Sequence, residues 1–292
     1  MVKANTMIKA IGICLLALGI SSSLALAETF PEHNLTLVVP YAAGGSTDVI
    51  ARSLQTAFAE RLNQTVVVEN RPGASSNIGS SYVARSGMDG YTMLLQSTMF
   101  SLFPKLYANL SYNPAKDFIP IGTVCVSPNI IVVSKNSSLK TREDLLDKGK
   151  KGLLSIGSAG TGTPGHLIIE QFSALNGIRV THVPYQGTAP AIPDLMGGRI
   201  DAIAGSLASF RGQLDRGDFR PLFIAATTRS SLAPTIPTAQ EAGFGQIDGG
   251  IRFLLLVRAG APADTISFLS KKLREVLAEQ KSWVQFLELD VK

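Results

Sequence analysis

The sequence contains one local pattern twice, at two places far apart in the chain. Residues 37–48 and residues 153–166 each begin as an apolar run, turn through a glycine-rich corner and continue as the polar start of an amphipathic helix. Such a corner directs backbone N–H groups and the positive end of a helix dipole at one point, which favours an anion. We therefore expect two facing corners to clamp one anionic ligand.

The energy of binding favours two corners over one. Micromolar affinity needs about −8 kcal/mol, whereas one helix terminus supplies roughly 0.3–2 kcal/mol. Charge-assisted hydrogen bonds add about 1.5–3 kcal/mol each before the costs of binding are subtracted. Two corners that close over one ligand reach the required energy, and a single corner does not.

Residues 1–27 have the pattern of a secretory signal peptide. Lys3 and Lys9 are positive, residues 10–20 are apolar, and residues 25–27 read Ala-Leu-Ala before Glu28. The alternative is an N-terminal membrane anchor, but the apolar run is too short to span a bilayer. We predict cleavage after Ala27 and an exported, soluble mature protein.

Length and composition narrow the class of protein further. Without residues 1–27 the 292-residue chain is long enough for two lobes or one large α/β domain. The formal net charge of +5 is too small and too dispersed to indicate nucleic-acid binding. Beyond Cys14 the chain has one cysteine, Cys125, in an apolar stretch. We interpret it as a buried, inert thiol, with a nucleophile as the alternative.

Apolar runs and helical patterns alternate along the chain. This alternation predicts an α/β fold of parallel sheets covered by helices. The apolar runs near 119–133 and 251–257 are the expected crossings between two lobes. The predicted lobes are residues 28–126 together with 250–292, and residues 127–249, with the ligand in the cleft between them. The predicted strands are 35–39, 66–68, 91–95, 119–126, 130–133, 153–156, 180–183, 200–204, 222–226 and 251–257, and the helices are 50–62, 77–85, one from Thr141, 165–175, 189–197, 207–214 and 265–279.

Each corner also has an ordinary structural interpretation. Ser46 or Thr47 is expected to cap the first helix through a side-chain oxygen. Asp48 is expected to stabilise the first helical turn, with an ammonium-binding role as the alternative. The spelling Gly160-x-Gly162-x-x-Gly165 fits a dinucleotide fingerprint, but no acidic residue follows the strand at 180–183.

The polar residues do not predict a cofactor or a metal. His166 follows the second corner and is interpreted either as a donor or base for an anion, or as a helix-start histidine. The spacing of His33, His166 and His182 does not suggest a metal site. No G-x-S-x-G nucleophile elbow occurs, and a distant Ser-His-Asp triad stays open.

Several ordered motifs resemble the Bug family, the periplasmic solute-binding proteins of tripartite tricarboxylate transporters. They are Pro40-Tyr-Ala-Ala-Gly-Gly-Ser-Thr-Asp48, Glu69-Asn-Arg-Pro-Gly-Ala74, Asn77-Ile-Gly79, Asp89-Gly-Tyr-Thr92 and Val183-Pro-Tyr-Gln-Gly187. Asp194-Leu195, Gly197-Gly198, Asp201, Pro237-Thr238 and Glu241-Ala-Gly243 extend the match, which covers about residues 30–280.

The resemblance implies a two-lobed Venus-flytrap fold of the type II periplasmic-binding-protein class. It implies a monomeric receptor that binds a small carboxylate without chemistry, cofactor or metal and delivers it to membrane permease subunits. The ligand-binding residues it implies are Tyr41, Ala43, Gly44, Gly45, Asp48, Ser97, Thr98, Ala159, Gly160, Thr161, Gly162, Thr163, His166, Gly187 and Thr188.

The chain departs from the family pattern in three places. Ala204-Gly205-Ser206 stands where the family usually has an aromatic and an Asp or Asn, so we expect a wider pocket or one polar contact fewer. Arg252 replaces a usual Trp, and a cation there favours a more acidic ligand if it faces the cleft. The family continues past Lys292 with a helix that packs on the first lobe, whereas residues 281–292 still have a helical pattern where the chain stops.

Two other functions stay open from the sequence. One keeps the fold and presents the closed form to a membrane sensor instead of a permease. The other is an exported hydrolase that uses a serine near His166. The sequence does not identify the carboxylate, because backbone amides recognise the charged group and contribute little to recognition of the rest of the ligand.

Overall fold

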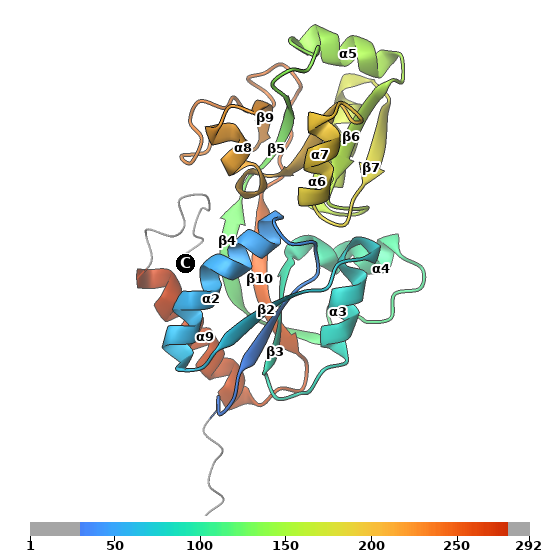
Figure 1. Ribbon diagram of the computed structural model, residues 1–292. Coiled ribbons are helices and arrows are strands. Elements are labelled where there is room, and N and C mark those ends of the chain that lie inside the picture. Colours follow the sequence, from blue (N-terminus) through green and yellow to red (C-terminus); the bar gives the residue numbers. More distant parts are fainter. Residues whose placement is uncertain (1–29, 280–292) are drawn as a thin grey trace, which may run out of the picture. The chain divides into compact units, whose positions relative to one another are not determined.

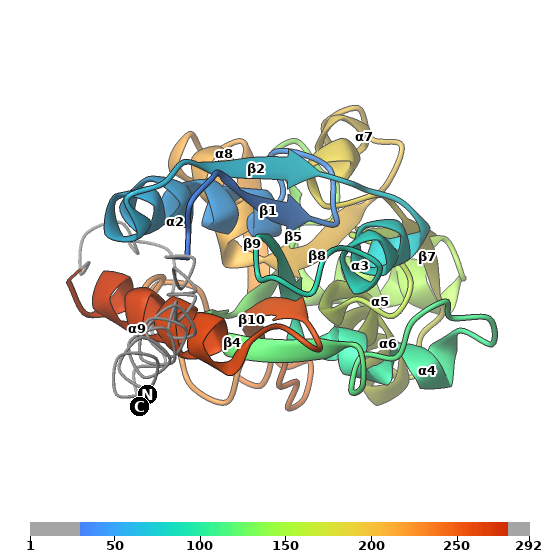
Figure 2. The same ribbon diagram turned by 90° about the horizontal axis from the view of Figure 1, so that it is seen from below.

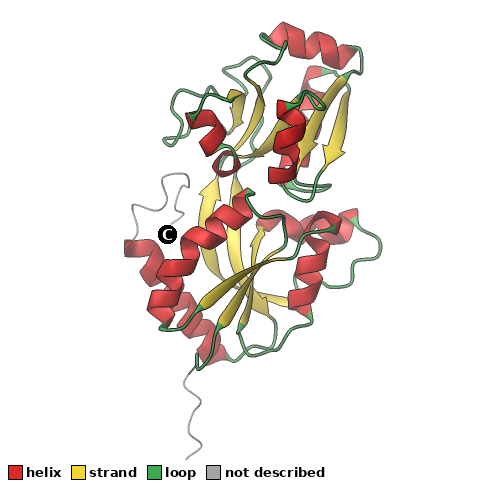
Figure 3. Cartoon of the chain, in the orientation of Figure 1, coloured by secondary structure: helices red, strands yellow, loops and turns green. Residues whose placement is uncertain are grey.

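The computed structural model describes residues 30–279, so the predicted signal peptide and the helical pattern at 281–292 lie outside the described residues. Contacts separate residues up to Glu32 from a second unit that begins at His33, and the fold below belongs to that second unit. It contains two five-stranded sheets with helices packed on them (Figures 1 and 3). Within residues 30–279, no helix is long and apolar enough to cross a membrane.

The first sheet has the strand order β2-β1-β3-β10-β4. β1 is parallel to both of its neighbours, with Leu35 opposite Val66 on one side and Leu37 opposite Met93 on the other. β10 runs antiparallel to β3 and β4. The bounds are β1 Leu35–Val39, β2 Val66–Asn70, β3 Thr92–Ser97, β4 Phe118–Ser127 and β10 Ile251–Arg258.

The second sheet has the strand order β7-β6-β8-β5-β9. β6 is parallel to β7 and β8, whereas β5 is antiparallel to β8 and β9. The prediction of parallel sheets is therefore wrong for β5 and β10, because a buried apolar run looks the same in either direction. The bounds are β5 Asn129–Ser134, β6 Leu154–Ser158, β7 Val180–Pro184, β8 Ala202–Ser206 and β9 Phe219–Ala225.

The helices follow the predicted alternation. Thr141 and Asp144 form the expected capping box at the start of α5, and Gly177 ends α6 in the left-handed conformation with φ 59°. The α-helices are α2 Ser46–Leu62, α3 Asn77–Ala84, α4 Phe103–Leu106, α5 Arg142–Lys150, α6 Pro164–Asn176, α7 Ile192–Met196, α8 Arg211–Asp215 and α9 Ala263–Glu279. Short 3₁₀ turns are η1 Ala74–Ser76, η2 Thr98–Leu102, η3 Ala189–Ala191 and η4 Leu207–Ser209.

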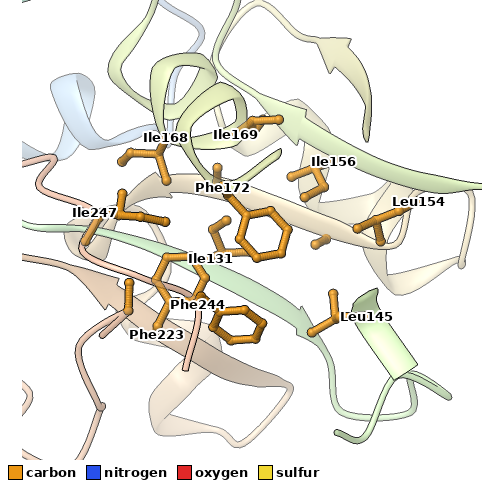
Figure 4. Close-up of a cluster of buried hydrophobic side chains, with 14 of the residues drawn as sticks. Ile131, Leu145, Leu154, Ile156, Ile168, Ile169, Phe172, Phe223, Phe244 and Ile247 are labelled. Atoms are coloured by element: carbon orange, nitrogen blue, oxygen red, sulfur yellow. The ribbon is translucent and has the colours of Figure 1, made fainter. Parts of the chain in front are cut away.

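Each sheet has its own hydrophobic core. In the second sheet, Phe172 of α6 packs against Phe223 of β9 and against Phe244, with ring centroids 5.8 and 5.3 Å apart (Figure 4). In the first sheet, α2 and α9 lie side by side (Figure 2), with Leu54, Phe58 and Leu273 buried. Cys125 is also buried, as predicted, and burial raises the pKa of its thiol.

Two short segments connect the sheets. The first passes from β4 through Pro128 into β5. The second leads to β10 through Gly249 and Gly250, and the Gly249 amide donates to the Ala225 carbonyl at 3.0 Å. The ends of the strands nearest these connections face the site described next.

Candidate functional site

A cavity is lined by residues from the starts of both α2 and α6. Gly45, Ser46 and Thr47 come from the first corner, and Thr163, Pro164 and Gly165 from the second. The remaining lining residues are Tyr41, Ser97, Asn129, Ala159, Gly187, Thr188, Ala204, Gly205, Ser206, Ile251 and Phe253. The two copies of the pattern therefore share one cavity.

The first corner leaves the amides at the start of α2 without a side-chain cap. Gly44 has φ 81°, a conformation that favours glycine, and Gly45 is the N-cap residue in an extended conformation. No side chain makes a cap hydrogen bond there, so the prediction that Ser46 or Thr47 caps the helix is wrong. Because the first N–H groups of a helix have no partner within the helix, they are available to a ligand.

The Asp48 carboxylate stabilises the first corner through hydrogen bonds. Its Oδ2 accepts hydrogen bonds from the Gly44 amide at 2.9 Å and from Arg52 Nε at 3.0 Å, and its Oδ1 accepts from Asn70 Nδ2 at 2.9 Å. Burial works to raise the pKa of the Asp48 carboxyl, but these hydrogen bonds outweigh it and the pKa is lowered. Asp48 does not line the cavity, so the geometry favours the structural interpretation of its charge.

The second corner is closed by neutral groups. Thr163 is the N-cap residue of α6, and its hydroxyl donates to the Gly160 carbonyl at 2.6 Å. Pro164 occupies the first turn, where its missing N–H costs nothing. A Cβ on Gly165 would lie 2.5 Å from the Ala204 carbonyl oxygen, so only glycine lets α6 approach β8 this closely. No side chain caps α6, which leaves its first amides without a side-chain partner, and the residues at its start line the cavity.

His166 supports the second corner instead of lining the cavity. Its Nδ1 accepts the Gly162 amide at 3.0 Å, and its ring stacks on His182 with centroids 4.0 Å apart. His182 Nε2 lies 2.7 Å from Ser158 Oγ. Burial, and then the proximity of His166, lower the pKa of His182 to about 4. The lowered pKa keeps His182 neutral near pH 7, and the stacked pair of imidazoles supports the loop before α6.

A buried polar network lies behind the lining residue Tyr41. The Tyr41 hydroxyl donates to Gln96 Oε1 at 3.3 Å, and burial raises the pKa of Tyr41 to about 12. Gln96 Nε2 in turn donates to Ser76 Oγ at 2.9 Å. Residues 74–76 all have positive φ, and a Cβ on Gly160 of the second corner would lie 2.7 Å from Ser75 Oγ. Strained backbone of this kind persists where the surrounding packing holds it.

The predicted site residues divide into two groups. Those that line the cavity are Tyr41, Gly45, Ser97, Ala159, Thr163, Gly187 and Thr188. Those that do not are Ala43, Gly44, Asp48, Thr98, Gly160, Thr161, Gly162 and His166. Within the second group, Thr161 accepts a 2.7 Å hydrogen bond from the hydroxyl of Tyr107, the residue that follows α4.

Other lining residues were not predicted as ligand contacts. Asn129 begins β5, Ala204–Ser206 end β8, and Ile251 and Phe253 begin β10. Alternation along β10 is the available signal, because residues two apart share one face of a strand. Arg252, between Ile251 and Phe253, is exposed and does not line the cavity. Arg252 was expected to favour a more acidic ligand only if it faced the cleft, so this expectation does not apply.

The cavity contains no charged side chain. None of the lining residues is Asp, Glu, Lys, Arg or His. Across residues 30–279, no group of three or more His, Cys, Asp or Glu residues is placed to hold a metal. The polar groups that face a ligand are thus backbone amides, hydroxyls and one carboxamide, which together suit a small anion with hydrogen-bonding substituents.

Comparison with known proteins places this geometry in a family. Residues 50–289 match the model of the tripartite tricarboxylate transporter family receptor. The structure of periplasmic binding protein BugD is 33% identical with a TM-score of 0.81, covering 87% of this chain and 85% of that one. MatC from Rhodopseudomonas palustris with bound malate is 28% identical with a TM-score of 0.77, covering 86% and 85%.

A third structure, Rpa4515 of R. palustris with adipate, is 31% identical with a TM-score of 0.78, covering 84% of this chain and 83% of that one. These similarities confirm the two-lobed periplasmic-binding-protein fold and the resemblance to Bug proteins. The chain belongs to the family of tripartite tricarboxylate transporter receptors.

Proposed function

We propose that the protein is a receptor that captures a small carboxylate in the cavity between the two corners. The observation that carries this proposal is the convergence of two uncapped helix starts on one cavity without charged side chains. Helix N-termini stabilise a carboxylate through unpaired amides and the helix dipole. Because no Lys or Arg lines the cavity, we expect backbone amides to stabilise the negative charge of the ligand.

The ligands of two relatives support the same class of substrate. MatC holds malate and Rpa4515 holds adipate, and both molecules are dicarboxylates. For this chain we propose direct contacts from the lining part of the predicted set, which includes Tyr41, Gly45, Ser97, Thr163 and Thr188. Gly44, Asp48, Gly162 and His166 support these contacts by holding the corners in shape.

The proposal extends to location and partners. The receptor is periplasmic, with its signal peptide cleaved after Ala27, and it acts as a monomer that delivers its ligand to the membrane subunits of a tripartite transporter. We propose the lobe boundaries predicted from the sequence, residues 28–126 with 250–292 and residues 127–249. The placement of β4 and β10 in one sheet, and of β5 and β9 in the other, supports this division.

We also propose that the cavity binds without catalysis. The serine nearest to a hydrolase geometry is Ser158, which lies 2.7 Å from His182. Ser158 is fully buried and does not line the cavity, so its hydroxyl is placed to support the loop and not to attack a ligand. An assay with a generic ester checks this point, and turnover that disappears in a His182→Ala variant would contradict it.

The decisive experiment removes one amide from the first corner. Ser46 is the first residue of α2, where proline is tolerated, and the Gly45 before it is already extended. Ser46→Pro deletes the N–H group, whereas the matched control Ser46→Ala deletes only the hydroxyl. Because a hydrogen bond to a charged group contributes about 1.5–3 kcal/mol, we expect Ser46→Pro to weaken binding roughly tenfold or more.

The measurement is isothermal titration calorimetry against a panel of mono-, di- and tricarboxylates. Circular dichroism checks that each variant is folded. Equal affinities of Ser46→Pro and Ser46→Ala would contradict the role of the amide. Failure of the folded wild-type protein to bind any carboxylate would overturn the proposed function.

A further inference from the structure

Asn129 occupies the point where the two connections between the sheets meet. It is the first residue of β5 and follows the segment that leaves β4. It is fully buried, with 0% of its surface exposed, and it lines the cavity. Its Nδ2 donates to the Gly249 carbonyl at 2.5 Å, which ties it to the segment that leads to β10.

That hydrogen bond fixes the orientation of the Asn129 carboxamide. A carbonyl oxygen only accepts hydrogen bonds, so the nitrogen of the carboxamide must face Gly249. A reversed carboxamide would place two oxygens in contact. Asn129 Oδ1 therefore lies on the other side, and it accepts no hydrogen bond from residues 30–279.

The lone acceptor is unusual within the described part of the chain. Arg71 Nε is the one other buried side-chain nitrogen or oxygen there that has no partner, and Arg71 does not line the cavity. Neighbouring hydroxyls are already engaged, since Ser206 Oγ lies 2.6 Å from Ser127 Oγ and Thr188 Oγ1 donates to Ser209 Oγ at 2.9 Å. A buried acceptor without a donor is unfavourable, so a ligand that supplies one is preferred.

Resting on the proposed function, we infer that Asn129 determines specificity by selecting carboxylates that carry a hydroxyl group. The ligand hydroxyl donates to Asn129 Oδ1 while the carboxylate is held by the amides of the corners. A plain carboxylate of the same length leaves the buried Oδ1 unpaired. Discrimination against a ligand that lacks the donor is the expected result of a buried unpaired group.

A hydroxyl fits this position better than an ammonium group. A buried ammonium needs an anionic partner, and no Asp or Glu lines the cavity. The carboxylate of Asp48 does not line the cavity, and it is already engaged by Gly44, Arg52 and Asn70. The site is thus expected to bind hydroxy acids more tightly than amino acids and more tightly than plain acids.

The test compares ligands on the wild-type protein. Calorimetry measures the dissociation constants of propionate and lactate, of succinate and malate, and of adipate and 2-hydroxyadipate, with both enantiomers of each hydroxy acid. In the pair that binds best, we expect one enantiomer of the hydroxy acid to bind at least about tenfold tighter, which corresponds to about 1.4 kcal/mol. The 2-fluoro analogue, which matches the hydroxyl in size and donates nothing, is expected to bind like the plain acid.

Variants then assign the preference to one residue. Asn129→Leu removes the acceptor at similar volume, and we expect the hydroxy-to-plain ratio to fall to about one. Ser134→Ala, at the other end of β5 and outside the cavity lining, is expected to keep the ratio. If Asn129→Leu does not fold, the wild-type comparison with the 2-fluoro acid decides the inference by itself.

The outcomes separate this inference from the proposed function. Equal affinity for plain and hydroxy acids overturns the role of Asn129 and leaves the receptor function intact. A ratio unchanged in a folded Asn129→Leu variant does the same. Tighter binding of the 2-amino acid than of the hydroxy acid also overturns it. Binding of no carboxylate by the folded protein overturns both.

Discussion

The two corners present similar main-chain geometry but are held in shape by different means. The first depends on a buried charge, because Asp48 accepts the Gly44 amide and pairs with Arg52. The second has no buried carboxylate, and it is held by Thr163, which donates to the Gly160 carbonyl, and by His166 Nδ1, which accepts the Gly162 amide. A Cβ on Gly45 would make an ordinary contact with Thr188, whereas a Cβ on Gly165 would clash with the Ala204 carbonyl oxygen. The two corners are therefore stabilised by different interactions, and we expect their stabilities to differ in their response to substitution and to pH.

The largest difference is expected from adding one methyl group to each corner. In Gly165→Ala the new Cβ meets the Ala204 carbonyl oxygen at 2.5 Å, whereas in Gly45→Ala the nearest atom is Thr188 Oγ1 at 3.4 Å. We expect Gly165→Ala to destabilise the protein by about 3 kcal/mol through overpacking against the backbone. Gly45→Ala should cost less than about 1 kcal/mol, the difference between glycine and alanine at an N-cap.

Urea unfolding followed by circular dichroism measures both variants. Similar losses in free energy of unfolding would show that the corners do not differ in packing. A loss confined to Gly45→Ala would reverse the comparison.

A second contrast concerns the charged and neutral supports. Asp48→Asn keeps the size of the side chain but cannot accept all three of its hydrogen bonds, so we expect a loss of about 2 kcal/mol. Thr163→Val removes one bond between neutral groups, and about 1 kcal/mol is expected. Thermal unfolding checks the order, and Thr163→Val costing as much as Asp48→Asn would contradict it.

The smallest expected effect is a difference in pH range. The pKa of His182 is lowered from 6.5 to about 4, so the unfolded chain binds this proton more readily than the folded one. Stability at the second corner is therefore complete above about pH 6.5 and decreases as the pH falls toward 4. We expect a loss of about 1 kcal/mol, because the imidazole is only half-buried and solvent screens it.

The first corner should respond in a lower pH range. The pKa of Asp48 lies below its usual value of 3.8, so its contribution persists at pH 5 and disappears only in stronger acid. Free energies of unfolding at pH 7, 5.5 and 4.5 test the difference, with His182→Gln as the variant that should flatten the profile. An equally steep profile in folded His182→Gln would assign the effect to another group.

The sequence predicted the order of strands and helices because hydrophobic periodicity and turn residues act locally. The capping box at Thr141 and the glycine end of α6 at Gly177 follow from such local signals. The reversed directions of β5 and β10 were missed, because strand direction depends on connections far away in the chain. The absence of a side-chain cap on α2 was missed too, since Asp48 turns to the Gly44 amide instead.

The site was predicted in part for the same reason. Glycine-rich corners are visible in sequence, so the two helix starts were found. Asn129 was not, because one polar residue before an apolar strand has no local signal for a role at a junction. Its importance depends on Gly249, which lies far along the chain and becomes its neighbour only in the folded protein.

The proposed anion site, built from main-chain donors, has an evolutionary consequence. Almost any replacement of Ser46 or Thr47 changes a side chain but keeps the N–H group, because proline alone lacks it. Recognition of negative charge is thereby insulated from most single substitutions. Diversification among descendants of such a scaffold can then proceed through the few side chains that read the remainder of the solute, with no loss of the common anchor.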